Sequence, residues 1–131
     1  MIFVDTSVLV GTLRGHRSAP IDRLAVLESS ATPYAIPMMC CQEVLQGAAN
    51  EREWRLLRAN LATQRLVIPA DPIAVHWEAA RIFFDCRRRG LTVRSSVDCL
   101  IAAIAIENRV PVWHRDRDFT AISRYTPLET L

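Results

Sequence analysis

A chain of 131 residues is long enough for one domain with a substantial core, and half of its residues are hydrophobic. Charged residues make up 23%, and a net charge of +2 is too small to indicate nucleic-acid binding by itself. This composition excludes a disordered chain, and no apolar run approaches the roughly 20 residues that a membrane helix needs. Because the N-terminus also lacks the basic start of a signal peptide, we expect a single domain over residues 1–131 in the cytoplasm, away from membranes.

The kinds of charged and sulfur-containing residues restrict the chemistry further. All 16 cations are arginine and none is lysine. Phosphate binding by a P-loop, Schiff-base catalysis and aspartyl-phosphate sites each require a lysine, so these classes are excluded. The cysteines show neither a Cys-x-x-Cys pair nor the spacing of a zinc site, and we expect them to be small buried hydrophobic residues. They are Cys40, Cys41, Cys86 and Cys99.

The first apolar run, residues 1–4, predicts a short buried strand that ends at Asp5. Apolar residues at helical spacing then predict a helix near 7–13, a polar loop over 14–20 and a helix over 21–29. Further strands are predicted at 34–36, 66–68 and 110–113, with a weak last strand at 126–129. Further helices are predicted at 38–48, 50–62, 72–89 and 95–106. Strands that alternate with helices predict an α/β fold, a three-layer α/β/α sandwich around a mostly parallel sheet of four to five strands.

Several helix boundaries carry recognisable signals. Asn50 is a candidate N-cap, and Asp71 followed by Pro72 is a strong helix start. Gly90 suits the position just after a helix. We interpret the arginines at 87–89 as compensating the negative end of that helix in preference to binding RNA. The helix that Ser95 opens is apolar on all sides except for one charge, Asp98, so we expect it to be buried.

Four carboxylates are predicted to meet at one edge of the sheet. Strands end at the carboxyl edge, and helices that return antiparallel to them begin there. Asp5 and Asp116 leave strand ends, Asp98 lies in the first turn of its helix, and Glu43 lies about one and a half turns into its own. Two unit charges 6 Å apart cost about 3 kcal/mol at an effective dielectric constant of 20. A divalent cation would offset this repulsion, and an all-oxygen ligand set indicates Mg²⁺ or Mn²⁺ rather than zinc.

Each acid also has a purely structural interpretation, which the sequence leaves open. Asp5 could cap the helix that follows it, and Ser95 with Asp98 fits a capping box. Glu43 could lie on a solvated helix face. Asp116 and Asp118 could be polar groups of a loop, with Asp118 capping a short helix that begins at Phe119.

The same residues, in this order, resemble the motifs of a known family. Asp5-Thr6-Ser7 after the first strand, an isolated Glu43, Asp98-x-Leu-Ile-Ala-Ala and Asp116-x-Asp118-Phe119 are similar to the motifs of PIN-domain nucleases. Its size and motif spacing are similar to those of the VapC toxins of toxin-antitoxin modules. The resemblance implies a PIN-like fold and a metal-dependent endoribonuclease that hydrolyses RNA phosphodiester bonds. It also implies a homodimer and a small VapB-like antitoxin whose C-terminal segment covers the acidic site.

On this hypothesis, the acids that match Asp5, Glu43, Asp98 and Asp116 are the catalytic set and hold Mg²⁺ or Mn²⁺. Asp5, Asp98 and Asp116 ligate the ion directly or through water, and Glu43 orients or deprotonates the attacking water. The alternatives are a PIN nuclease that processes RNA without an antitoxin, and a catalytically silent interaction module of the same fold.

The residues around this set have weaker assignments. Thr6 and Ser7 either support a ligand carboxylate or cap the helix, and Asp118 is supporting because its family position varies in role. Three arginines border the site and could hold RNA phosphates or be solvated: Arg94, Arg115 and Arg117. Whether His114 touches substrate is open, because many family members have a small polar residue there.

Overall fold

A computed structural model describes residues 1–13 and 33–131 of the chain. The predicted loop over 14–20 and the predicted helix over 21–29 lie outside the described residues. No helix in these two ranges is long and apolar enough to cross a membrane.

Four parallel strands form the central sheet, as predicted. They are β1 (Ile2–Val4), β2 (Tyr34–Pro37), β3 (Leu66–Val67) and β4 (Val112–Trp113). Their order is β3-β2-β1-β4, so the N-terminal strand lies inside the sheet between two parallel neighbours. Phe3 and Val4 are almost fully buried, which explains the uninterrupted apolar run that marked this strand in the sequence.

The predicted last strand at 126–129 is wrong in position. This part of the chain pairs with the sheet at a single parallel bridge between Thr130 and Val112. The preceding residues turn instead of extending, because the Thr126 hydroxyl donates to the Ile122 carbonyl and Pro127 has no N–H for a ladder.

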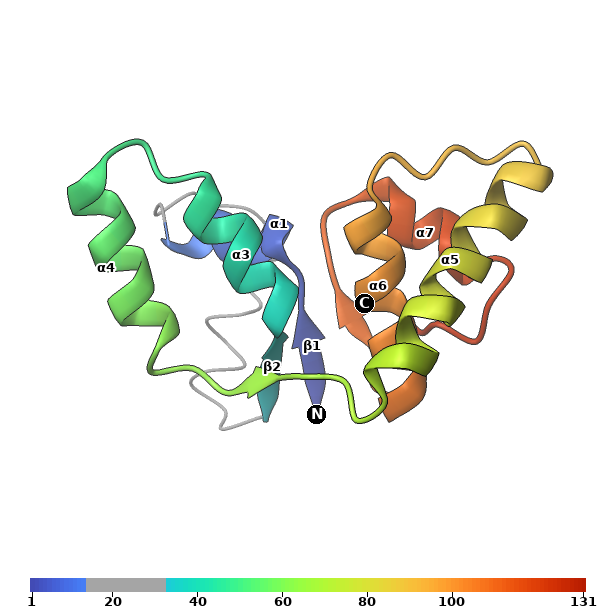
Figure 1. Cartoon of the computed structure of the whole chain (residues 1–131), viewed down its shortest axis with the longest axis horizontal. Coiled ribbons are helices and arrows are strands. Elements are labelled where there is room, and N and C mark those ends of the chain that lie inside the picture. Colours follow the sequence, from blue (N-terminus) through green and yellow to red (C-terminus); the bar gives the residue numbers. More distant parts are fainter. Residues whose placement is uncertain (14–32) are drawn as a thin grey trace.

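The helices are α1 (Thr6–Leu13), α3 (Met38–Gln46), α4 (Glu51–Leu61), α5 (Pro72–Arg88), α6 (Ser96–Asn108) and α7 (Arg117–Ser123). Figure 1 shows α3 and α4 on one side of β1 and α5, α6 and α7 on the other, with α5 packed along α6. A parallel sheet with helices packed around it agrees with the predicted α/β/α fold.

Most of the predicted helix boundaries are confirmed. The side chains of Asn50 and Asp71 accept hydrogen bonds from the backbone N–H groups of Glu53 and Ala74 and so cap α4 and α5. Gly90 has a φ of 75°, which is the left-handed conformation expected just after the end of α5.

Helix α6 is the buried helix that its sequence predicted. Five of its apolar residues are at most 2% exposed: Ile101, Ala102, Ala103, Ile104 and Ala105. Asp98, its one acid within the apolar stretch, is also buried, at 5% exposure. All four cysteines are buried and free, as predicted.

Candidate active site

Asp5 follows β1 directly, and the Asp5 N–H donates to the Trp113 carbonyl of the neighbouring strand at 3.0 Å. Its carboxylate is 3% exposed. Oδ2 accepts hydrogen bonds from the backbone N–H of Ser7 at 3.0 Å and from the Ser7 hydroxyl, so Asp5 caps α1 through this oxygen. Oδ1 is buried without a hydrogen-bond partner. Burial raises the pKa of Asp5, the Ser7 bonds oppose that shift, and the charge of Asp116 adds to it.

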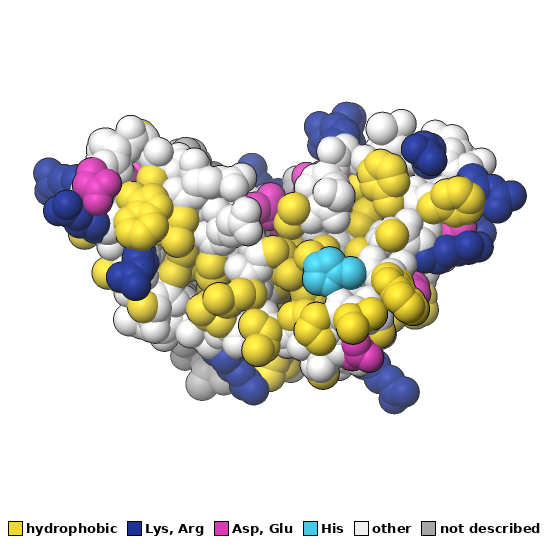
Figure 2. Space-filling view, viewed as in Figure 1, with side chains coloured by type: hydrophobic (Ala, Val, Ile, Leu, Met, Phe, Trp, Pro, Cys, Tyr) yellow, Lys and Arg dark blue, Asp and Glu magenta, His cyan; other side chains and the backbone are white. Residues whose placement is uncertain are grey.

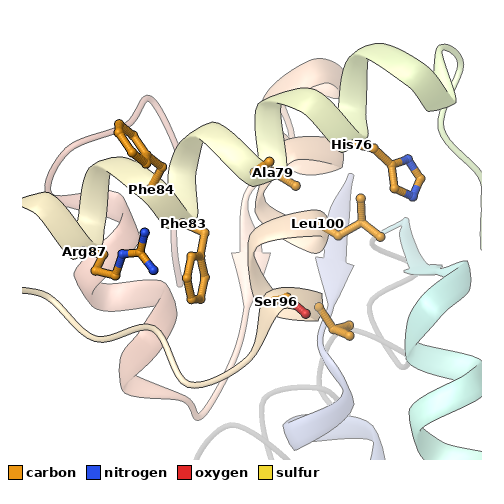
Figure 3. Close-up of a pocket in the computed structure, with 9 residues that line it drawn as sticks. His76, Ala79, Phe83, Phe84, Arg87, Ser96 and Leu100 are labelled. Atoms are coloured by element: carbon orange, nitrogen blue, oxygen red, sulfur yellow. The ribbon is translucent and has the colours of Figure 1, made fainter.

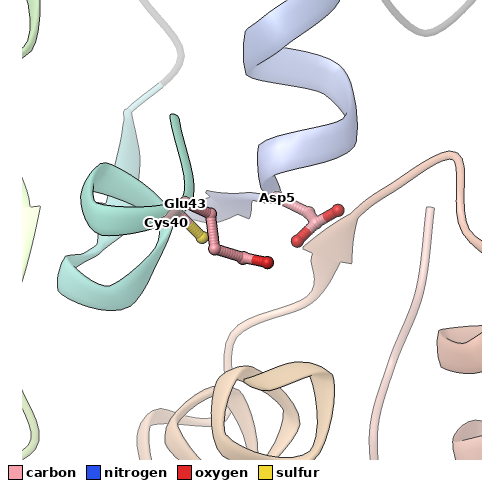
Figure 4. A group of neighbouring side chains, drawn as sticks. All are labelled: Asp5, Cys40 and Glu43. Atoms are coloured by element: carbon pink, nitrogen blue, oxygen red, sulfur yellow. The ribbon is translucent and has the colours of Figure 1, made fainter. Parts of the chain in front are cut away.

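Glu43 approaches Asp5 from α3, in the second turn of that helix (Figure 4). The hydroxyl of Thr6, the first residue of α1, donates to Glu43 Oε1 at 2.8 Å and ties the two helices together. Glu43 is only partly exposed, and burial raises the pKa of its carboxyl group, to which the charges of Asp5 and Asp116 contribute. The fully solvated interpretation of Glu43 is therefore wrong, because a solvated carboxylate would show neither this bond nor this shift.

A second acidic group is formed by Asp98, Asp116 and Asp118, which offer carboxylate oxygens within 4.8 Å of one another. Asp98 Oδ2 is buried without a hydrogen-bond partner. Burial, followed by the charges of Asp5 and Asp116, raises the pKa of Asp98 to about 8. Protonated Asp98 can donate to Asp118, which favours the neutral acid further.

The capping interpretations of this second group are corrected by the structure. Ser95 occupies the N-cap position of α6 but its side chain makes no capping bond, so the predicted capping box is absent. Asp116, not Asp118, caps α7: Asp116 Oδ1 accepts from the backbone N–H of Asp118 at 2.9 Å. With Asp116 as the cap, the helix begins at Arg117. A cap at Asp118 would have placed the start of the helix two residues later.

Electrostatic coupling joins the two groups into one site. The charge of Asp116 raises the pKa of Asp5, Glu43 and Asp98 alike. Figure 2 shows acidic side chains in the hollow between two raised parts of the molecule, with arginines along the outer rims. The structure thus brings together the four acids that the sequence placed at the carboxyl edge of the sheet.

The carboxylates fit a divalent cation by a test that is independent of any relative. Two buried oxygens, one on Asp5 and one on Asp98, lack the hydrogen bonds that buried polar atoms almost always have. Both belong to acids whose pKa is raised by burial and by neighbouring negative charge. A bound cation would satisfy the two oxygens and remove the repulsion, and an oxygen-rich set suits Mg²⁺ or Mn²⁺.

The arginines around the site differ in whether their side chains pair with the acids. Arg94 Nη2 pairs with Asp116 Oδ1 at 3.3 Å, and its Nε lies 3.8 Å from Asp118 Oδ1. The backbone N–H of Arg94 also donates to Asp118 Oδ2 at 3.0 Å. The side chains of Arg115 and Arg117 are exposed, while the Arg115 backbone N–H donates to the Ser7 hydroxyl. Arg94 is therefore engaged with the acids, whereas the other two are accessible.

His114 supports the loop that carries Asp116. Its Nδ1 accepts from the backbone N–H of Asp116 at 3.1 Å, and its ring packs on Phe119 with ring centroids 5.0 Å apart. Burial lowers the pKa of His114, so the neutral ring that accepts this bond is favoured. These contacts give His114 a positioning role in the structure.

Asp118, predicted as a supporting residue, is 2% exposed and belongs to the second acidic group together with Asp116. One feature of the site was missed in the sequence. Cys40 lies beside Asp5 and Glu43, with its sulfur within 4.8 Å of an oxygen of each acid (Figure 4). The spacing of Cys40 and Glu43, three residues apart on one helix, was the available signal.

A separate hollow lies between α5 and α6 (Figure 3). Its lining is mostly apolar and includes Phe83, Phe84 and Leu100. Among the described residues no carboxylate lines it, which distinguishes this groove from the acidic site.

The sequence profile of the PIN domain family matches residues 2–125. The chain belongs to the PIN-domain family, which confirms the resemblance seen in its motifs.

Within that family the chain is similar to ribonuclease VapC11 of Mycobacterium tuberculosis strain H37Rv, with 35% identity over 130 residues, 98% of this chain and 96% of that protein. VapC ribonuclease Mb1587 of Mycobacterium bovis matches with the same identity and coverage. Among solved structures, VapBC2 from Rickettsia felis bound to a promoter DNA fragment has a TM-score of 0.74 at 17% identity, covering 100% of this chain and 98% of that chain. This last likeness concerns the fold alone.

Proposed function

We propose that the protein is a metal-dependent endoribonuclease that hydrolyses RNA phosphodiester bonds and acts as the toxin of a toxin-antitoxin pair. The observation that carries the chemistry is the pair of buried, unpartnered carboxylate oxygens on Asp5 and Asp98 within one acidic site. The substrate class comes from the relatives, since two proteins that match nearly the whole chain are named ribonucleases.

We assign each residue a role from its contacts. Asp5, Asp98 and Asp116 hold a divalent ion, Mg²⁺ or Mn²⁺, which when bound lowers the pKa of a coordinated water and neutralises charge on the phosphate oxygens. Glu43 orients the attacking water and accepts its proton, a role that its raised pKa suits. Thr6 keeps the Glu43 carboxylate turned towards the site through its hydroxyl.

Substrate contacts are proposed for the exposed arginines. Arg115 and Arg117 flank Asp116 in the chain and have exposed side chains that can hold RNA phosphates bidentately. Arg94 is already paired with Asp116, so its guanidinium has fewer donors left for RNA than those of Arg115 and Arg117.

We further propose a small VapB-like antitoxin and a homodimer, both in the cytoplasm. Solved structures that share the fold include a toxin-antitoxin complex and a member of the VapBC family of toxin-antitoxin systems, which supports a partner of this kind. The antitoxin is expected to place a basic side chain against the acids, and the Arg94–Asp116 pair illustrates how such a contact occupies the site. The silent-module alternative is disfavoured, because a chain without metal chemistry would have little reason to bury two unpartnered oxygens.

The test is cleavage of RNA by purified protein with Mg²⁺, with Mn²⁺ and with EDTA, using Asp5→Ala purified in parallel as the control for contaminating nuclease. We expect cleavage only with a metal ion and only by the wild type. Cleavage by the wild type in EDTA, at a rate that Asp5→Ala does not match, would rule out the metal mechanism.

The toxin role has its own test. Expression without a partner should arrest growth, and sequencing of the RNA ends produced soon after induction should identify the target. If wild type and Asp5→Ala are equally harmless at equal expression, the toxin assignment loses its support.

A further inference from the structure

Cys40 is placed in the acidic site by the same helix that carries Glu43. The two residues are three apart on α3 and project from the same face towards Asp5 (Figure 4). Cys40 is 0% exposed, yet its sulfur and one oxygen from each of the two acids lie within 4.8 Å of one another. Within the described residues, no other cysteine belongs to such a group.

The carboxylate of Asp5 has one buried oxygen left for a ligand. Oδ2 of Asp5 is held by Ser7 on the α1 side, and the other oxygen, Oδ1, has no hydrogen-bond partner. Glu43 is likewise held through one oxygen by Thr6. Two carboxylates that are each fixed by a hydroxyl, beside a thiol, form a pre-oriented ligand set of the kind that metal sites use.

The donor atoms of this set differ from those of the second acidic group. Asp98, Asp116 and Asp118 offer oxygen only, which suits hard ions such as Mg²⁺. A thiolate with two carboxylates instead favours zinc and chemically similar ions, which bind sulfur readily and accept three protein ligands with a fourth position open.

We propose that Asp5, Cys40 and Glu43 form a sulfur-containing subsite that takes Zn²⁺, and that the closely related Cd²⁺ can report on it. On binding, a metal–sulfur bond forms and the thiol proton of Cys40 passes to the solvent. If the proposed nuclease function holds, Zn²⁺ in this subsite inhibits it, because the ion engages Asp5 and Glu43 together. The binding itself does not depend on that function.

The first experiment titrates reduced, metal-free protein with Cd²⁺ and follows the ultraviolet charge-transfer band of a cadmium–thiolate bond. We expect the band to saturate with one equivalent in the wild type and to be lost in Cys40→Ala. Cys41→Ala is the matched control, because Cys41 is the next residue and is also buried, at 8% exposure, but lines a groove beside Trp54. A band that persists in Cys40→Ala, or that disappears in Cys41→Ala, overturns the proposal.

A second measurement needs no substitution of Cys40. X-ray absorption of the wild type loaded with one equivalent of Zn²⁺ should show one sulfur neighbour at about 2.3 Å together with oxygen neighbours. Glu43→Gln should keep the sulfur neighbour while weakening Zn²⁺ binding by at least about 10-fold, because even the loss of a residue that supports a ligand costs this much. A zinc environment without sulfur overturns the proposal.

The two proposals fail separately. Protein that cuts RNA with Mn²⁺ but shows no cadmium–thiolate band refutes the zinc subsite and leaves the nuclease intact. Protein that shows the Cys40-dependent band but never cuts RNA refutes the nuclease and leaves the subsite intact.

Discussion

Replacing Asp98 by Asn should stabilise the metal-free protein and abolish its activity. Asp98 is 5% exposed, carries a buried unpartnered oxygen and has its pKa raised to about 8. At neutral pH its carboxyl group therefore takes up a proton on folding, which costs at most about 4 kcal/mol at roughly 1.36 kcal/mol per pKa unit. Solvent screens part of this cost, so we expect Asp98→Asn to gain about 1 to 3 kcal/mol.

The assay compares melting temperatures of wild type and Asp98→Asn in EDTA at low salt, and again in excess Mn²⁺. For a domain of this size each kcal/mol corresponds to roughly 3 to 5 °C. In EDTA the variant should melt higher, and the difference should grow as pH rises from acidic values towards the pKa of about 8. In Mn²⁺ the wild type should gain more, because stabilisation by a ligand follows its affinity for the folded state.

Asp71→Asn is the matched control for this experiment. Asp71 caps α5 outside the acidic site, and Asn caps helices about as well as Asp, so the change should be small in both conditions. An Asp98→Asn variant that melts lower than wild type in EDTA, and gains as much from Mn²⁺, would refute the repulsion argument and remove Asp98 from the site.

Three further outcomes are expected. Glu43→Gln should lower turnover by about 10²- to 10⁴-fold while leaving RNA binding in Ca²⁺ nearly unchanged, and a variant that cleaves normally would return Glu43 to a structural role. The folded-state pKa values of Asp5 and Asp98 are raised, so the metal-free protein binds more protons folded than unfolded. Its melting temperature should therefore decrease as the pH rises from about 4 to about 8, and a flat profile in EDTA would contradict these shifts. Asp116→Asn and Asp116→Ala should both lose activity, but only Ala should also lose the α7 cap and about 0.5 to 2 kcal/mol, as chemical denaturation can measure.

Much of this site could be predicted from the sequence, because the elements that form it follow local rules. The buried strand before Asp5, the caps at Asn50 and Asp71 and the apolar helix around Asp98 each follow from a few adjacent residues. The rule that strand ends and helix starts share one edge then brings the acids together without any knowledge of tertiary contacts.

The remaining features depend on contacts between distant segments. The pairing of Arg94 with Asp116 joins two loops, and the sulfur of Cys40 reaches Asp5 only because α3 packs on α1. At the start of α7, both Asp116 and Asp118 are good capping residues, so local preference could not choose between them. The prediction of the last strand failed for a related reason, since a single bridge at Thr130 leaves no alternating pattern in the sequence.

The double contact of Asp116 has a consequence for how such a protein can lose its activity during evolution. One of its oxygens starts α7 while the carboxylate also belongs to the acidic site. Asn or Ser at this position would keep the helix start and give up the negative charge. A relative with either residue at the position of Asp116 could therefore stay folded after the chemistry was gone, whereas a hydrophobic replacement would weaken both together.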